Sequence, residues 1–311
     1  MTINTRPLIS FIVIAYNQEK YIKEAIEGAF SQTYEPLEIV LSDDNSPDNT
    51  FEIMKKMADE YEGPHTVVLN KNTKNMRLIG HMNKAVQLSR GRLFVMNAGD
   101  DISYKERVSN VYQAWVNSDY KAKMIVSSHQ CIALNGEFIK KPIVRDLVYK
   151  DASEFIFKYP DVDGAACAYD RDIFEKFGSL NVTSLEDRTM AFRAILIGNV
   201  VFIPSIDILY RDGGMSKINQ KNWNIKYHGK VYMQLLYDLD NSTITGNEKL
   251  QLIKDYALSY LIWIHRAKSY LDSNKKINKK LNFIYFLLFN FTSSSFLKNI
   301  KMIIRVIMNK I

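Results

Sequence analysis

LFVMNAGDD, residues 93–101, places a short apolar run directly before two adjacent carboxylates, Asp100 and Asp101. The run contains β-branched and aromatic residues, which is typical of a buried strand. A corner of small residues, NAG at 97–99, separates the run from the carboxylates. Open α/β sheets bind ligands just beyond the carboxyl ends of their strands, so this stretch predicts a central strand followed by a functional loop.

The flanking sequence alternates between strand-like and helix-like segments. Strand-like runs occupy 8–14, 37–41, 66–69 and 93–96, and helical patterns occupy about 19–32, the segment after Asp48, and 79–88. Repeated β-α units of this length predict an α/β fold with a doubly wound, mostly parallel sheet and right-handed crossovers. Beyond residue 121 the pattern is mixed, with a strand at 124–134, a hairpin turn at Asn135-Gly136 and a short helix starting near Asp151.

Composition limits the class of protein. A hydrophobic content of 47% in 311 residues is ample for a core. Cys131 and Cys167 are far apart and form no Cys-x-x-Cys pair, so we expect neither a zinc site nor a disulfide framework, and a reducing compartment. The first residues show no basic-then-apolar signal pattern, so we expect a cytoplasmic and not a secreted protein.

Charge is distributed unevenly along the chain. Residues 213–311 hold 16 Lys or Arg against 5 Asp or Glu, whereas the rest holds 25 against 29. From about residue 220 onward the chain has helical spacing and almost no Gly or Pro. We therefore expect a helical, basic region over 216–311 after a domain over 1–215.

The basic region carries two amphipathic signals. An apolar segment, 283–291, follows four lysines at 275–280, and it is too short to span a bilayer, which needs about 20 apolar residues. Apolar residues also recur at helical steps near the end, at Leu297, Ile300, Ile304, Ile307 and Ile311. Two interpretations stay open: the helices lie on an anionic membrane surface, or they pack on the first domain or on a second subunit. We expect no nucleic acid partner, because no nucleic-acid module is present.

Three acidic pairs fall at positions where a loop should follow a strand or where a helix should begin. They are Asp43-Asp44, Asp100-Asp101 and Glu186-Asp187. Each pair alone is also compatible with the turn and cap preferences of Asp. Parallel-sheet geometry places the first two pairs at one edge of the sheet. Carboxylates together with substrate phosphates are the usual ligands of Mg²⁺, and a separate carboxylate such as Asp187 can act as a general base.

Several motifs together resemble the family 2 glycosyltransferases with the GT-A fold. They are ISFIVIAYN at 9–17, AIEGAFSQTY at 25–34, LEIVLSDDNSPDNT at 37–50, Asn83 and Gly91 in an N-x-A…G stretch, 93–102 in place of the Asp-x-Asp segment, and the Glu186-Asp187 pair. The resemblance covers about residues 8–212. It implies a GT-A catalytic domain over 1–215, with a nucleotide-binding half at about 1–103 and an acceptor half at about 104–215.

The resemblance also implies roles for particular residues. Asp100 would be the ligand of Mn²⁺ or Mg²⁺, and Asp187 would deprotonate the acceptor hydroxyl in an inverting displacement. The residues expected to bind substrates are Ala15, Tyr16, Asn17, Asp44, Arg77, Gly99, Asp101, Glu186 and Arg211. Arg211 would lie near the donor diphosphate, although pairing with Asp212 is an equally open interpretation.

The implied partners are a nucleoside-diphosphate sugar, with UDP or dTDP favoured, and a saccharide acceptor that is lipid-linked at the cytoplasmic face of a bacterial membrane. A homo-oligomer is left open. Ala98 departs from the family pattern, because it stands where many members have the first Asp of Asp-x-Asp. A catalytically degenerate homologue that acts as a membrane-associated scaffold is therefore the alternative. A dehydrogenase or a pyrophosphorylase is disfavoured, because the first β-α turn lacks a glycine-rich loop.

Overall fold

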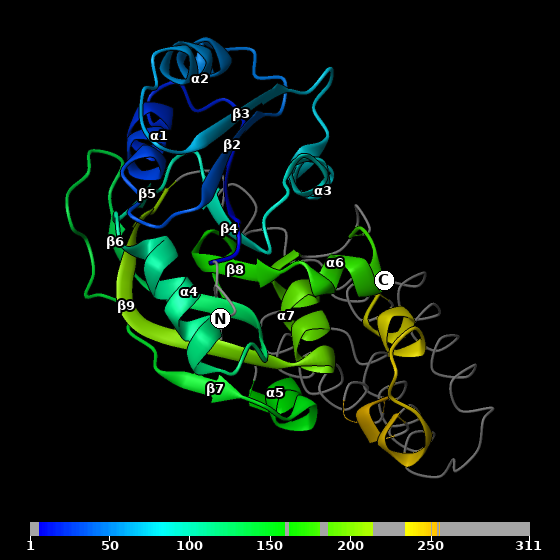
Figure 1. Cartoon of the computed structure of the whole chain (residues 1–311). Helices are drawn as coiled ribbons and strands as arrows, with labels where there is room; N and C mark the ends of the chain where they lie inside the picture. The colour runs from blue at the N-terminus through cyan, green and yellow to red at the C-terminus, as the bar shows by residue number, and fades with distance from the viewer. Residues whose placement is uncertain are drawn as a thin grey trace, which may run out of the picture.

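A computed structural model describes residues 6–158, 162–180, 186–213, 234–249, 251–253 and 255 of the chain. Nine strands form one sheet in the order β3-β2-β1-β4-β8-β6-β9-β5, with β7 paired to β9 (Figure 1). The strands are β1 Ile9–Ala15, β2 Leu37–Asp43, β3 Thr66–Lys71, β4 Leu93–Ala98, β5 Ile102–Ser103, β6 Ala122–Ile132, β7 Leu147–Tyr149, β8 Cys167–Asp170 and β9 Asn199–Arg211.

The first half of the sheet is parallel. β1 pairs with β2 and β4, and β2 pairs with β3, all in parallel. The predicted α/β fold is thereby confirmed. In the second half, β8 is antiparallel to both β4 and β6, whereas β6 and β9 are parallel. The segment 164–170 contains the 3₁₀ turn η1 Gly164–Ala166 and then β8.

Helices cover both faces of the sheet. They are α1 Ile22–Phe30, α2 Thr50–Asp59, α3 Arg77–Leu88, α4 Arg107–Asn117, α5 Ala152–Lys158, α6 Asp172–Phe177 and α7 Glu186–Ile197. Neighbouring residues of β1 bury into different clusters: Phe11 packs with α1, α2 and α4, whereas Ile12 packs with α3 and α5–α7. This alternation follows from the two-residue period of a strand, so the sheet is the middle of three layers.

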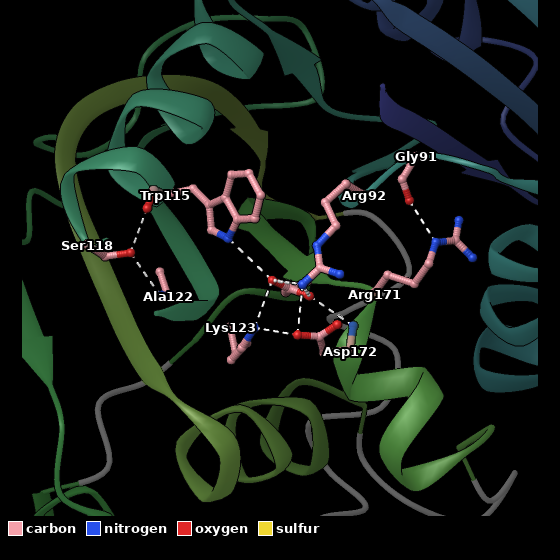
Figure 2. A network of polar contacts seen from close by, with 9 residues as sticks. Gly91, Arg92, Trp115, Ser118, Ala122, Lys123, Arg171 and Asp172 are labelled. Atoms are coloured by element: carbon pink, nitrogen blue, oxygen red, sulfur yellow. Dashed lines mark hydrogen bonds and ion pairs between the residues drawn. The ribbon is translucent and has the colours of Figure 1, made fainter. Parts of the chain in front are cut away.

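A network of buried ion pairs holds the edge of the sheet at which β4 begins (Figure 2). The Asp170 carboxylate, at the end of β8, accepts hydrogen bonds from Arg92 Nη2 at 2.9 Å, Lys123 Nζ at 3.1 Å and Trp115 Nε1 at 3.2 Å. Both cations also pair with Asp172, at 2.7 Å and 2.6 Å. We call Arg92, Lys123, Asp170 and Asp172 the basal clamp. It ties β4, β6 and β8 together.

Glu38 provides a second polar contact at this edge. Its carboxylate is fully buried and accepts hydrogen bonds from Ser10 Oγ at 2.5 Å, from the Gly91 amide at 3.1 Å and from Arg90. Burial by itself would raise the pKa of Glu38, but the hydrogen bonds from Arg90, Ser10 and Gly91 outweigh it and hold the pKa below its ordinary value. Glu38 is therefore a charged group fully satisfied from within the chain.

Part of the basic region packs on the sheet domain. Arg193 of α7 forms a buried ion pair with Asp238, with Nε to Oδ2 at 2.8 Å, and Leu235, Leu236 and Leu239 bury in the same cluster as α7. The amphipathic segments at 275–291 and 297–311 lie outside the described residues. Among the residues that are described, no helix is long and apolar enough to cross a membrane.

Candidate active site

The carboxyl ends of β1, β2 and β4 meet at one edge of the sheet. The Asp44 amide donates to the Ala15 carbonyl at 2.9 Å, and the Gly99 amide donates to the Ile14 carbonyl, also at 2.9 Å. The pairs Asp43-Asp44 and Asp100-Asp101 therefore flank the end of β1, as the sequence predicts. We call this the carboxyl edge, and the opposite edge, which holds the basal clamp, the amino edge.

The turn after β1 is fixed by side chains of the turn after β2. Asn17 has a left-handed backbone, with φ 57°, and its amide donates to Ser46 Oγ at 2.9 Å. Ser46 is held in turn by Asp43, which accepts its hydroxyl at 2.5 Å and its amide at 2.9 Å. Asp43 therefore has the turn-forming role, and the half-buried Tyr16 and exposed Asn17 are presented at the edge.

Gly99 allows the β1 and β4 turns to approach each other. A Cβ at this position would lie 2.3 Å from Gln18 Oε1 and 2.9 Å from the Ala15 Cβ. Any larger residue would push the turn that contains Asp100 and Asp101 away from Ala15. We call these two residues the acidic turn.

Asp44 connects β2 to the start of α3. Its Oδ1 accepts hydrogen bonds from Asn72 Nδ2 and from the Met76 amide, both at 2.8 Å. The next residue, Arg77, is exposed and has a φ of 60°. Asp44 and Arg77, which the family resemblance places around the nucleotide, thus lie at neighbouring positions of the carboxyl edge.

His81 of α3 contacts the end of β2. It is buried and its Nε2 lies 2.8 Å from Ser42 Oγ. Burial lowers the pKa of His81, so the ring is neutral at pH 7. By contrast, Leu78 in the first turn of α3 is 51% exposed.

The two carboxylates of the acidic turn differ in environment. Asp101 is buried, and its Oδ1 accepts a hydrogen bond from the Arg211 amide at 2.8 Å. Asp100 is half-buried. Burial raises the pKa of Asp100, and burial together with the charge of Asp100 raises the pKa of Asp101 well above its ordinary value. A group that neutralises negative charge would therefore be bound favourably here.

Arg211 packs behind the acidic turn. Its guanidinium donates to the Asp100 carbonyl at 2.9 Å, to the Leu134 carbonyl at 3.0 Å and to Glu24 Oε2 at 2.5 Å. The Arg211 side chain is 2% exposed and also lies over the Tyr21 ring. Its carboxylate partner is thus Glu24 of α1, and Asp212 pairs with Lys140 at 2.8 Å. Arg211 fixes the shape of the acidic turn from inside the fold.

Arg107 is a buried residue at this edge that the sequence reasoning missed. It is fully buried, and it donates to Asn97 Oδ1 at 3.1 Å, to Ser103 Oγ at 2.8 Å and to the carbonyls of Met96 and Ala165 at 2.7 Å and 2.6 Å. Burial lowers the pKa of Arg107 to about 10, so it is a cation at pH 7. Arg107 therefore bridges the end of β4 and η1.

This bridge brings the third acidic pair toward the other two. Glu186 begins α7, and its Oε1 lies 3.1 Å from the position that a Cβ on Gly164 of η1 would occupy. Burial and the adjacent charge of Asp187 raise the pKa of Glu186 to about 8. The Asp187 carboxylate accepts the Arg188 amide at 2.6 Å. The start of α7 thus carries one carboxyl that is protonated at pH 7 and a second one beside it.

The residues at the carboxyl edge suit a divalent cation shared with a substrate. Mg²⁺ and Mn²⁺ are commonly held by one or two carboxylates, with substrate phosphates completing the shell. The half-buried Asp100 meets that requirement. Among the described residues, no group of three His, Cys, Asp or Glu side chains is placed to hold a metal.

The sheet and its acidic turn define the fold as the GT-A type of the glycosyltransferases. The structure of S. aureus TarS 1–349 in complex with UDP-GlcNAc matches with a TM-score of 0.67 at 15% identity, over 88% of this chain and 78% of that one. The mannosyltransferase PcManGT from Pyrobaculum calidifontis, in complex with GDP-Man and Mn²⁺, matches with a TM-score of 0.54 at 14% identity, over 99% and 88%. At these identities the likeness establishes the fold alone.

The chain belongs to glycosyl transferase family 2, because the model of that family matches residues 10–178, more than half of the chain. One relative is a putative glycosyltransferase EpsE of Bacillus subtilis, 34% identical over 34% of this chain and 37% of that protein. Another is WfaP of Escherichia coli, a UDP-Glc:α-D-GlcNAc-diphosphoundecaprenol β-1,3-glucosyltransferase, 33% identical over 33% and 39%. The chain thus spans about two fifths of the length of these curated relatives.

Proposed function

We propose that the protein is an inverting glycosyltransferase that moves a sugar from a nucleoside diphosphate to a saccharide acceptor. The observation that carries the proposal is the convergence of three acidic pairs on the carboxyl edge of a GT-A sheet. Two of them flank the end of β1, and Arg107 connects the third, through η1, to the end of β4. Binding and proton transfer are thereby assigned to different carboxylates.

The donor would bind across the turns after β1, β2 and β4. The buried Ala15 ends β1, Tyr16 and Asn17 are presented after it, and Asp44 and Arg77 lie at the adjacent turn, where they would face the nucleotide. Asp100 would hold Mn²⁺ or Mg²⁺ together with the donor diphosphate, beside Gly99 and Asp101. When bound, such a cation offsets the charge that develops on the departing diphosphate.

Proton transfer is assigned to Asp187. Glu186 has a pKa of about 8 and is therefore neutral at pH 7, so it suits hydrogen bonding to the acceptor better than accepting a proton. An ionised Asp187 beside it would accept the proton of the acceptor hydroxyl while the diphosphate departs from the opposite face of the sugar. That division of roles gives inversion in one displacement.

The acceptor and the setting are proposed from relatives. WfaP is named for transfer from UDP-Glc to a diphosphoundecaprenol-linked sugar, and TarS is described with UDP-GlcNAc. We infer a UDP- or dTDP-sugar donor and a lipid-linked saccharide acceptor in bacterial surface polysaccharide synthesis. The basic region 216–311 would place the enzyme on the anionic inner face of the cell membrane.

Thermal unfolding of the full chain with UDP, dTDP and GDP, each with and without Mn²⁺, tests donor binding. A ligand that binds the folded state raises the melting temperature, and we expect UDP or dTDP to do so more strongly with metal. Asp100→Asn should lose the metal-dependent part of the shift and retain the fold. Product mass after incubation with UDP-, dTDP- and GDP-sugars then identifies the donor. Failure of every nucleotide to shift the melting temperature with metal present would refute the proposal.

Ala98 favours a second candidate, a catalytically degenerate GT-A homologue that acts as a membrane-associated binding or scaffold protein. Ala98 pairs with Ile14 at the end of β4, where a carboxylate would have reached the donor or a metal-bound water. The same experiments decide between the two candidates. A chain that binds nucleotide without any metal dependence, and that forms no product from any donor, is the degenerate homologue.

A further inference from the structure

The segment between β6 and β7 exposes an unusual amount of apolar surface. In Figure 1 it is the loop that runs outside β6 and β9. Of the twelve large hydrophobic residues that are exposed in the described part of the chain, four lie in this segment and two more at the start of β7. They are Leu134 at 50%, Phe138 at 68%, Ile139 at 43%, Val144 at 55%, Leu147 at 45% and Val148 at 51%.

This exposure is part of an ordered hairpin. The turn closes with the Ala133 amide donating to the Glu137 carbonyl at 2.8 Å, with Gly136 at a φ of 86°. The returning arm pairs with β6 through His129 and Ile143, which exchange amide to carbonyl hydrogen bonds at 3.1 Å and 2.8 Å. The backbone is thus held by the sheet while Phe138 and its apolar neighbours project outward. We call residues 133–146 the β6–β7 hairpin.

Cations accompany the apolar residues on the returning arm. Its sequence at 138–145, FIKKPIVR, contains three cations and no carboxylate. Lys141 is exposed, and the Lys140 side chain is 58% exposed while it contacts Asp212. Exposed aromatic and aliphatic residues next to Lys and Arg are the composition of a surface that enters the headgroup region of an anionic bilayer.

The base of the hairpin adjoins the acidic turn. Arg211 donates to the carbonyls of Ala133 and Leu134, at 3.3 Å and 3.0 Å, and the same guanidinium donates to the Asp100 carbonyl. A membrane bound to the hairpin would therefore lie next to the carboxyl edge of the sheet. This position suits an acceptor that is attached to a lipid.

We propose that the β6–β7 hairpin is a membrane-contact site that inserts Phe138 and Ile139 into the interface of an anionic bilayer. The site is separate from the basic region 216–311. It orients the carboxyl edge toward lipid-linked acceptors, and this orienting role rests on the proposed function, whereas the membrane contact does not.

Vesicle binding of the full chain, measured without donor or acceptor, tests the contact. Phe138→Ser/Ile139→Ser should weaken binding to vesicles of three parts phosphatidylcholine and one part phosphatidylglycerol by at least about tenfold. Tyr120→Ser, which removes another exposed side chain, 47% exposed and located before the start of β6, is the matched control and should bind like the wild type. An unchanged melting temperature with UDP in the double variant verifies that the fold and the donor site are intact.

A second measurement reports on the hairpin itself, whatever the basic region contributes. Cys131 and Cys167 are both buried, so a polarity-sensitive fluorophore can be attached to Glu137→Cys, with Glu62→Cys as the control position. We expect a blue shift on the anionic vesicles at position 137 and none at position 62. No shift at 137, or equal vesicle binding by the wild type and the double serine variant, would overturn the proposal. So would a wild-type dimer that the double variant converts to a monomer, because a second copy would then cover the hairpin.

Discussion

Buried carboxylates occupy both edges of the sheet, and the two edges treat them in opposite ways. At the amino edge, Asp170 has Arg92, Lys123 and Trp115 as partners, and the pKa of Glu38 is held below its ordinary value by its hydrogen bonds. At the carboxyl edge, burial raises the pKa values of Asp101 and Glu186. The negative charge of a buried carboxylate is therefore fully compensated by its partners at the amino edge and only partly compensated at the carboxyl edge.

The difference separates a carboxylate whose charge is compensated from within the chain from one that an external group would still stabilise. At the amino edge, partners within the chain compensate the carboxylates, and this lets β8 insert between β4 and β6. An external group would add no further stabilisation there. The incompletely compensated negative charge at the carboxyl edge costs free energy, and a bound cation would offset that cost. Four predictions test whether this division holds: three in order of decreasing effect, and one on pH.

The largest effect is expected at the Glu186-Asp187 pair. Asp187→Asn should lower the rate of transfer by about 10²- to 10⁴-fold, the range for loss of a general base, while the donor-induced thermal shift is retained. Glu186→Gln imitates the neutral form that Glu186 has at pH 7, so we expect it to lose less than about tenfold, within the worth of one or two hydrogen bonds. Steady-state kinetics on both variants checks this. Equal losses would mean that the two carboxyls share one role.

The second prediction compares stability at the two edges. Asp170→Asn leaves Arg92 and Lys123 facing a neutral amide, and we expect a loss of about 3 kcal/mol, the lower end for breaking a buried pair, because Arg92 is partly exposed. Asp101→Asn can still accept the Arg211 amide and removes a poorly compensated charge, so its cost should be below about 1 kcal/mol. Urea denaturation measures both values. A larger loss for the Asp101 variant would reverse the assignment of the edges.

The third prediction uses two arginines. A lysine cannot reproduce the contacts of Arg211 to Asp100, Leu134 and Glu24, so Arg211→Lys should weaken donor binding with metal by about tenfold. Arg92→Lys should lower the melting temperature and leave the dissociation constant of the donor unchanged. Calorimetric titration of both variants with UDP and Mn²⁺ distinguishes these effects. Weaker donor binding by the Arg92 variant would show that the two edges are coupled.

The fourth prediction concerns pH. Glu186 keeps its proton up to about pH 8 in the folded chain, against a reference pKa of 4.5. Between these pH values the folded state binds more protons than the unfolded state, so this group lowers stability as the pH rises. The melting temperature of the wild type should therefore fall relative to that of Glu186→Gln between pH 5 and pH 8. Parallel pH profiles for the two proteins would contradict the buried, protonated state.

Local patterns in the sequence were enough to predict the first half of the fold. The strands of the parallel half and the turn at Asn135-Gly136 follow from hydrophobic periodicity and turn residues, which act over a few positions. The adjacency of Asp44 and the acidic turn followed from topology alone, because parallel strands end at the same edge.

Long-range partners could not be predicted in the same way. The antiparallel pairing of β8 and the contact between Arg211 and Glu24 join segments that are far apart in the chain. No local pattern in a single sequence indicates that such segments pair. Arg107 had a local clue, since it lies four residues before Val111 and eight before Trp115, on the apolar stripe of α4. A cation on such a stripe indicates a buried side chain that forms several hydrogen bonds inside the fold.

The hydrogen bond between Asp101 and the Arg211 amide joins positions 110 residues apart. During synthesis the acidic turn leaves the ribosome long before β9 does, so the nascent chain holds two adjacent carboxylates whose closing partner does not yet exist. Chain closure over that distance is slow compared with formation of the local β-α units. The carboxyl edge therefore closes only after β9 has been synthesised, and a chain shortened before Arg211 would lack the amide that holds the Asp101 carboxylate.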